Sequence, residues 1–276
     1  MPVVRVRDID LYYEIHGTGP RLFFIGGSGG DLRQRPGVFD GPLVEQFQVL
    51  SYDQRGLGRS STPPGPYTMQ DYAEDAAALL DTVGWDHCLV MGVSFGGMVA
   101  QELVIRFPDR VQRLVLACTS SGGSGGGSFP LHELQDLAEE ERLLQMIGIS
   151  DTRIDDAWKN ANPDALASLI NFARRRSESK TSTDDDAGDE AADASTGQRL
   201  QLEARAGHDS YDRLAGIALP VYICAGKFDG IAPPDNQHEL AKAIPNARLD
   251  FFDGGHMFLI QDKTSFRKIA AFLLEN

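Results

Sequence analysis

A single serine stands between glycines in the stretch GVSFGG, from Gly92 to Gly97. The apolar run CLVM precedes this stretch, and MVAQELVIRF, with helical spacing, follows it. The pattern G-x-S-x-G between a strand and a helix is typical of a nucleophile held at a tight, strained turn, where glycines permit close backbone crossing. Ser94 is therefore the candidate nucleophile. The N-terminus of the following helix would favour negative charge beside it.

A serine hydroxyl needs a base within hydrogen-bond reach, usually a histidine oriented by a carboxylate. Of the six histidines, His256 follows the last strand-like run, ARLDFFDGG, in a glycine-rich loop, and is the predicted base. The predicted carboxylate is Asp229, in the turn GKFDGIAP after the run PVYICAG. Asp253, three residues before the histidine, is a rival, and Asp53 is a weaker one. We expect Asp53 instead to hold the turn DQRGLGRSS through Arg55 and nearby backbone.

Acyl transfer also requires two backbone N–H groups aimed at the developing negative charge, each worth about 3 to 4 kcal/mol of barrier. The residue after the nucleophile, Phe95, is expected to supply one of them. The loop GGSGG, which follows the apolar run RLFFI, is expected to supply the other. We place this second N–H at Ser28, with Gly27 as the alternative.

The elements that would position these residues alternate between strand-like and helix-like patterns. The short apolar runs RLFFI, FQVLSYD, CLVMGV and VQRLVLACT are typical of strands covered on both faces. Helical spacing covers residues 68–83 and 97–107, and the start VVRVRDIDLYYEIHG predicts two antiparallel strands. This alternation predicts a mostly parallel sheet flanked by helices, with the chemistry at the carboxyl ends of the strands.

After Thr119 the alternation stops, and it returns only at Leu219. The intervening segment begins with the glycine-rich hinge SSGGSGGGS and continues with helix-like sequence. Its part SESKTSTDDDAGDEAADASTG, residues 177–197, is acidic and predicts a disordered or loosely held loop. We therefore predict a core of residues 1–119 and 216–276 with a helical cap, or lid, inserted at residues 120–215.

Bulk composition favours a protein that acts on small molecules. The chain of 276 residues carries a net charge of -14, which disfavours nucleic acid and membrane surfaces as partners. The basic run Arg174 to Arg176 is followed at once by acids. Neither a secretory signal nor a long apolar run is evident, so we expect a cytoplasmic protein. The three cysteines lack metal-ligand spacing and are expected to be buried thiols, with no metal or cofactor.

With these residues assembled, the chain resembles the α/β-hydrolase superfamily over nearly its full length. The resemblance rests on the oxyanion loop IGGSGG, the turn YDQRGLGRSS, the elbow GVSFGG, the acid turn GKFDGIAP and the histidine loop GGH. It implies an eight-stranded, mostly parallel sheet with a cap inserted after the sixth strand. Within the superfamily the chain is similar to small bacterial carboxylesterases and 3-oxoadipate enol-lactonase-like enzymes. It departs in one position, because Gly26 stands where the commoner loop has a histidine.

The predicted function is a serine hydrolase that cleaves a small carboxylic ester or lactone through an acyl-enzyme. The same triad would also serve a thioesterase, a hydrolase of carbon–carbon bonds, or a cofactor-free perhydrolase or haloperoxidase. A non-catalytic small-molecule receptor is an alternative of a different class. The arginines at 174–176 could hold a substrate carboxylate or form a solvated helix end. The residues expected to line the substrate pocket are Phe24, Gly27, Met98, Trp158 and Met257.

Overall fold

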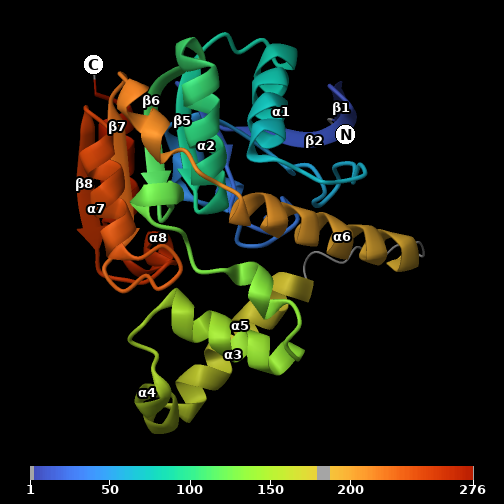
Figure 1. The fold of residues 1–276 in the computed structure, drawn as a ribbon, viewed down its shortest axis with the longest axis vertical. Helices are drawn as coiled ribbons and strands as arrows, with labels where there is room; N and C mark the ends of the chain where they lie inside the picture. Colours follow the sequence, from blue (N-terminus) through green and yellow to red (C-terminus); the bar gives the residue numbers. More distant parts are fainter. Residues whose placement is uncertain (1–2, 179–186, 276) are drawn as a thin grey trace.

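A sheet of eight strands forms the centre of the computed structural model, which describes residues 3–178 and 187–275 (Figure 1). The strand order is β1-β2-β4-β3-β5-β6-β7-β8. The pairs β1·β2 and β2·β4 are antiparallel, and every other neighbouring pair is parallel, as predicted. The strands are β1 (Val3–Val6), β2 (Ile9–His16), β3 (Arg21–Ile25), β4 (Gln48–Tyr52), β5 (Cys88–Val93), β6 (Val111–Ala117), β7 (Val221–Gly226) and β8 (Ala247–Phe252).

Helices cover both faces of this sheet and form two apolar clusters with it. One cluster packs α1 (Met69–Thr82), α2 (Phe95–Arg106) and α7 (Pro234–Ala243) against the strands, and the other contains α9 (Ser265–Leu273). The helix α1 begins where a capping box predicts it: the Thr68 hydroxyl accepts from the backbone N–H of Asp71, whose carboxylate accepts from the N–H of Thr68. The central strands are thus buried on both faces, which explains their continuous apolar sequences.

The described part of the segment between β6 and β7 contains the α-helices α3 (Glu139–Ser150), α4 (Asp156–Ala161), α5 (Pro163–Glu178) and α6 (Ala187–Ala206), besides short 3-10 turns. Figure 1 shows α3, α4 and α5 beyond the carboxyl end of β6, with α6 between them and the core. The insertion point after the sixth strand is the one that the resemblance implies. The boundaries 120 and 215 for a separate cap stay a prediction.

The prediction of a loop over residues 177–197 is wrong at both of its ends. The helix α5 continues to Glu178, and α6 begins at Ala187, while residues 179–186 lie outside the described part. Alanine is the strongest helix former, and the stretch AGDEAADAST contains several. Tertiary packing also contributes, because the same helix places Gly197 against Gly56 and buries Leu200 in the core. The low content of large apolar residues was therefore a poor guide to the described ends of this segment, which are helical.

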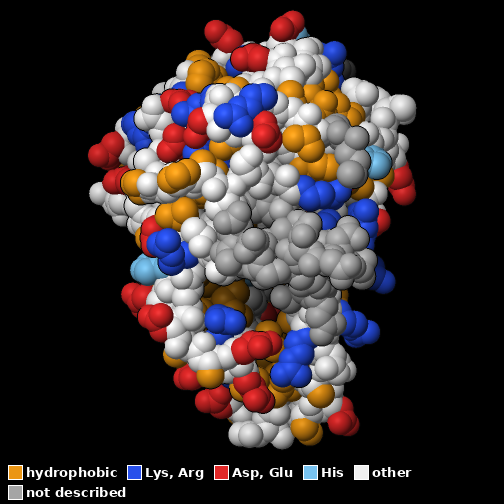
Figure 2. Space-filling view, turned by 90° about the vertical axis from the view of Figure 1, so that its right-hand side faces the viewer, with side chains coloured by type: hydrophobic (Ala, Val, Ile, Leu, Met, Phe, Trp, Pro, Cys, Tyr) orange, Lys and Arg blue, Asp and Glu red, His pale blue; other side chains and the backbone are white. Residues whose placement is uncertain are grey.

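The surface mixes charges of both signs. Figure 2 shows acidic and basic side chains interspersed over one face, with a hollow floored by hydrophobic side chains in its lower half. Among the described residues, no helix combines the length and the apolar character needed to span a bilayer. The three cysteines are free and buried, as expected.

Candidate active site

The predicted nucleophile occupies a strained turn between β5 and α2. Ser94 has φ 55° and ψ -117°, a conformation that costs a non-glycine residue free energy and is found mainly at functional sites. A Cβ at Gly92 would lie 2.3 Å from the carbonyl oxygen of Gly96, and a Cβ at Gly96 would lie 2.0 Å from that of Ile25. Both positions therefore require glycine. At Gly92 the close contact is within the turn itself, and at Gly96 it is with the last residue of β3.

Three side chains from three loops form one chain of hydrogen bonds. The Nε2 of His256 lies 3.0 Å from the Oγ of Ser94, and its Nδ1 lies 2.8 Å from Oδ2 of Asp229. Ser94 follows β5, Asp229 follows β7 and His256 follows β8. These strands are parallel, so their carboxyl ends lie at one edge of the sheet. The arrangement can move a proton from the serine to the imidazole and stabilise the resulting cation.

The carboxylate of Asp229 is fixed by its own loop. Its Oδ1 accepts hydrogen bonds from the backbone N–H groups of Ile231 and Ala232 at 2.8 and 2.9 Å, and the side chain is fully buried. The other oxygen is thereby left for the imidazole. The rival Asp253 is largely exposed and faces Arg153 instead.

The weaker rival, Asp53, has a structural position that was only partly predicted. Its two oxygens accept from the backbone N–H groups of Leu32 and Arg59, which ties the loop after β3 to the turn after β4. Arg55 does not take part, contrary to expectation, because it is buried against Asp75 on α1. Burial raises the pKa of Asp53 to about 6, in spite of the two N–H donors.

The two predicted oxyanion donors follow β5 and β3, which are neighbouring strands of the sheet. Phe95 is the first residue of α2, and Ser28 belongs to the loop after β3. Among the hydrogen bonds of the described residues, none uses the N–H of Phe95 or of Ser28. The same loop touches the nucleophile, since a Cβ on Gly27 would lie 3.5 Å from the Cβ of Ser94. Both N–H groups are therefore available near the serine, and their role stays a prediction.

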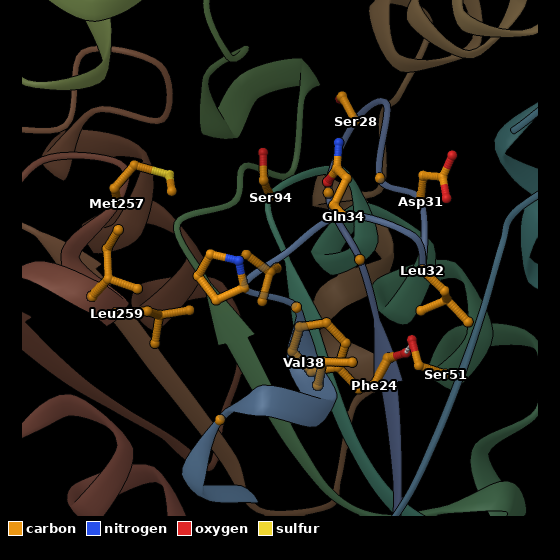
Figure 3. Close-up of a pocket in the computed structure, with 18 of the residues that line it drawn as sticks. Phe24, Ser28, Asp31, Leu32, Gln34, Val38, Ser51, Ser94, Met257 and Leu259 are labelled. Carbon is orange, nitrogen blue, oxygen red and sulfur yellow. Dashed lines mark hydrogen bonds between the residues drawn. The ribbon is translucent and has the colours of Figure 1, made fainter. Parts of the chain in front are cut away.

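A cavity of about 390 Å³ opens beside Ser94 and His256. Figure 3 shows Ser94 between Met257 and Leu259 on one side and Ser28 and Gln34 on the other, with Phe24 and Val38 below. Three of the five predicted pocket residues, Phe24, Gly27 and Met257, line this cavity. Sequence reasoning did not identify the wall formed by the segment after the oxyanion loop, including Leu32, Gln34 and Val38. The sequence could have indicated this wall, because the segment directly follows the predicted oxyanion loop GGSGG.

The two remaining pocket predictions are wrong for this cavity. Met98 lies one turn beyond Ser94 on α2 and lines a second, smaller cavity, while Trp158 on α4 is not among the described residues that line the first. The basic run also lies elsewhere. Arg174 and Arg175 are exposed on α5 and do not line the cavity, and the side chain of Arg176 is outside the described part.

The end of the cap helix α3 is joined to the loops that carry the acid and the base. The carbonyl oxygen of Ser150 accepts from the backbone N–H of His256 at 2.6 Å, and that of Ile149 accepts from Gly230 at 2.9 Å. Next to them, Gln261 accepts from the N–H of Gly255 and donates to Asp151. These contacts were not predicted, because nothing in the cap sequence indicates which backbone groups it presents to the core.

One group of potential metal ligands occurs in the described part of the chain. Ligand atoms of Cys118, Asp229 and His256 lie within 4.8 Å of one another. Burial raises the pKa of the Cys118 thiol well above its usual range, and only a thiolate ligates metal well. The other two residues already hold each other by a hydrogen bond. The donor set therefore suits proton transfer better than metal binding.

Comparison with known proteins places this geometry in a family. A poly(3-hydroxyalkanoate) depolymerase from Ectopseudomonas oleovorans is 32% identical over 246 residues, covering 87% of this chain and 78% of that protein. The 3-oxoadipate enol-lactonase 2 of Acinetobacter baylyi is 25% identical over 265 residues, covering 94% and 91%. The crystal structure of an enol-lactonase from Burkholderia xenovorans LB400 shares the fold, with a TM-score of 0.76 at 24% identity, over 99% of this chain and 100% of that one.

These relatives agree with the predicted enzyme class, a hydrolase. The predicted fold class is also confirmed, since the sheet, the flanking helices and the matched structure coincide. The model of the α/β hydrolase fold matches residues 20–263, which is most of the chain. The chain therefore belongs to the α/β hydrolase fold family.

Proposed function

We propose that this protein is a serine hydrolase that cleaves a small, uncharged carboxylic ester or lactone through an acyl-enzyme. The observation that carries the proposal is the continuous chain of hydrogen bonds from Asp229 through His256 to Ser94, at the edge of a largely apolar cavity. A nucleophile, a base and an orienting carboxylate in this order are the parts that acyl transfer needs. The names of two relatives, a poly(3-hydroxyalkanoate) depolymerase and an enol-lactonase, support hydrolysis at a carbonyl group, while the preference for an uncharged substrate rests on the cavity alone.

In the first step the Oγ of Ser94 attacks the substrate carbonyl carbon while its proton passes to Nε2 of His256. Asp229 holds the Nδ1 proton of the ring, so that Nε2 is the free acceptor, and it stabilises the imidazolium that forms. The carbonyl oxygen becomes negatively charged and accepts from the N–H groups of Phe95 and Ser28. The imidazolium then gives its proton to the leaving alcohol.

In the second step water replaces the alcohol. The same His256 removes a proton from the water, whose oxygen attacks the acyl carbon, and the proton returns to Ser94 as the acid departs. A lactone follows the same path, except that its alcohol stays attached to the product. The triad supplies both nucleophile and proton transfer from its own side chains.

The cavity favours an uncharged acyl group. Apolar side chains, including Phe24, Val38 and Leu259, form much of its wall near the serine, and the polar Ser28 and Gln34 on the other side carry no charge. Among the described lining residues Arg35 is the one permanently cationic side chain, and it is already paired with Asp40. A substrate carboxylate would therefore enter without a free cation, at the cost of its hydration. We accordingly favour neutral esters and lactones over acidic ones such as an enol-lactone bearing a carboxylate.

The test is a panel of nitrophenyl esters of rising chain length, beside neutral lactones, an acidic lactone and a thioester, compared by kcat/KM. Ser94→Ala should lower kcat on the best substrate by about a million-fold, because the triad acts as a unit. A fluorophosphonate should label the unaltered protein stoichiometrically and leave Ser94→Ala unlabelled. Labelling without turnover of any panel member would indicate a receptor, and unchanged turnover in Ser94→Ala would refute the proposed nucleophile.

A further inference from the structure

A second cavity of about 140 Å³ lies apart from the proposed active site. It is bounded by Met98 on α2, by the chain between β6 and α3, and by the carboxyl end of α6. No described residue lines both cavities. Its polar and charged walls come from Ser128, His132, Arg205 and His208.

The Arg205 guanidinium in this cavity is buried, and the described residues supply no counterion to it. The residue is 5% exposed, and its Nη1 donates to the carbonyl oxygen of Phe129 at 2.8 Å. Its Nε and Nη2 are buried and have no hydrogen-bond partner. Burial lowers the pKa of Arg205 to about 10, and no carboxylate in the described part of the chain opposes the effect. A buried cation in this state is costly, and proteins normally pair such groups.

The two unpaired nitrogens lie on one edge of the guanidinium group. Their N–H bonds point the same way, at the spacing of the two oxygens of a carboxylate, and this edge is the one that carboxylates bind bidentately. A monatomic anion can accept from both bonds only with a bent geometry, because it has one acceptor atom where a carboxylate has two. The chemistry that completes Arg205 is therefore that of a small carboxylate.

A second buried polar atom in the same cavity lacks a partner. The Nδ1 of His208 is unpaired, and the residue is 6% exposed. Burial lowers its pKa to about 4, so the ring is neutral at pH 7, and a neutral imidazole can carry its proton on Nδ1. The nearby carboxylate of Glu102 is already paired with Arg213 and Arg106, so it does not serve as the counterion.

We propose that this second cavity is a binding site for a small monocarboxylate of the size of formate or acetate, held by the Nε and Nη2 edge of Arg205. The bound anion would join the carboxyl end of α6 to the chain before α3 and to α2. The second cavity shares no described lining residue with the proposed active site, so a test of anion binding does not rest on ester hydrolysis.

The test measures thermal unfolding and titration calorimetry with sodium formate and sodium acetate at constant ionic strength. Formate at about 100 times its Kd should raise the Tm by about 5 °C or more. Arg205→Met should abolish this effect. Arg199→Met is the matched control on the same helix, since Arg199 is exposed and pairs with Glu203, and it should behave like the unaltered protein. Acetamide, which is neutral, should give no shift.

Three outcomes would overturn the proposal. The first is the absence of a saturable formate effect in the unaltered protein, and the second is an equal effect in Arg205→Met. The third is equal affinity for chloride and formate, which would contradict bidentate binding. If Arg205→Met does not fold, Arg205→Lys keeps the charge and loses the edge, and its formate Kd should rise at least about tenfold.

Discussion

The backbone N–H of His256 donates to the carbonyl oxygen of Ser150 at 2.6 Å. Ser150 is the last residue of α3, so the proposed base is held by its ring through Asp229 and by its backbone through the cap. The inserted segment therefore contacts the backbone of the residue that carries the proposed base. We expect this contact to help set the distance between the imidazole and Ser94, so changes in α3 should affect turnover as well as substrate binding.

The first prediction separates the two candidate carboxylates. Asp229→Asn can keep its Oδ1 contacts with the N–H groups of Ile231 and Ala232, so the loop should stay folded. The amide nitrogen would then face Nδ1 of His256 and force the proton onto Nε2, which can no longer accept from Ser94. We expect kcat to fall by about ten-thousand-fold on a nitrophenyl ester.

The matched control for that prediction is Asp253→Asn, which alters the exposed rival three residues before the histidine. Its kcat should stay within about twofold of the unaltered protein, because Asp253 contacts no triad residue. The assignment of Asp229 would be refuted if Asp253→Asn lost more activity than Asp229→Asn, with both variants folded by circular dichroism.

The second prediction concerns the contact between α6 and the core. A Cβ at Gly197 would lie 1.8 Å from the carbonyl oxygen of Gly56, so alanine cannot be accommodated without moving one backbone. Gly197→Ala should therefore lower the free energy of unfolding by about 1 to 3 kcal/mol, even though alanine favours helix by about 1 kcal/mol. Gly207→Ala, where the nearest contact would be an ordinary 3.7 Å, should be close to neutral. Equal urea midpoints for the two variants would show that α6 does not pack on this turn.

The local motifs of the site could be predicted from the sequence. Gly92, Ser94 and Gly96 define a turn whose steric demands are local, and the strand runs on either side identify the sheet edge. Asp229 and His256 could be found because parallel strands bring their following loops to that same edge. A serine nucleophile needs a histidine base and a carboxylate that orients it, and few residues of these types follow the strands at that edge.

The walls of the cavity could not be predicted in the same way. Met98 and Trp158 are apolar residues of the right kind, but the sequence does not show which cavity an apolar side chain lines: Met98 lines the second cavity, and Trp158 lines neither of the two. Which cavity a side chain lines depends on how the inserted helices pack on the core. This packing includes backbone contacts such as the hydrogen bond from His256 to Ser150. The helix α6 was missed for a similar reason, because the close packing of Gly197 on Gly56 is a tertiary contact that the local sequence does not show.

The third prediction is a pH dependence of stability that arises from Asp53. Burial raises its pKa to about 6, against about 3.9 for an unfolded chain, so the native state binds this proton more tightly. The resulting stabilisation is complete below about pH 4 and is lost as the pH rises through about 6. The free energy of unfolding of the unaltered protein, relative to that of Asp53→Asn, should fall by on the order of 3 kcal/mol between pH 4 and pH 7.

Urea unfolding of both proteins at pH 4, 5.5 and 7 measures this difference, and the other titrating groups cancel in the subtraction. The control is Asp40→Asn. The backbone N–H of Gly37 holds the pKa of Asp40 below its usual range, so the Asp40 difference should have the opposite sign and fade as the pH falls. A pH-independent difference for Asp53→Asn would mean that Asp53 is ionised in the native state throughout this range.

The last prediction tests the cap as a frame for the base. Gln261 accepts from the backbone N–H of Gly255 and donates to Asp151, so it joins the histidine loop to the residue that follows α3. Gln261→Met removes both hydrogen bonds and keeps the length of the side chain. We expect kcat on a nitrophenyl ester to fall by about fivefold, which corresponds to about 1 kcal/mol of activation free energy, because only part of the two lost hydrogen bonds acts on the position of His256, with KM little changed. Ile260→Ala, at an exposed neighbour that lines the cavity, should change KM more than kcat. If Gln261→Met leaves kcat unaltered while lowering the Tm, the bridge stabilises the fold without positioning His256.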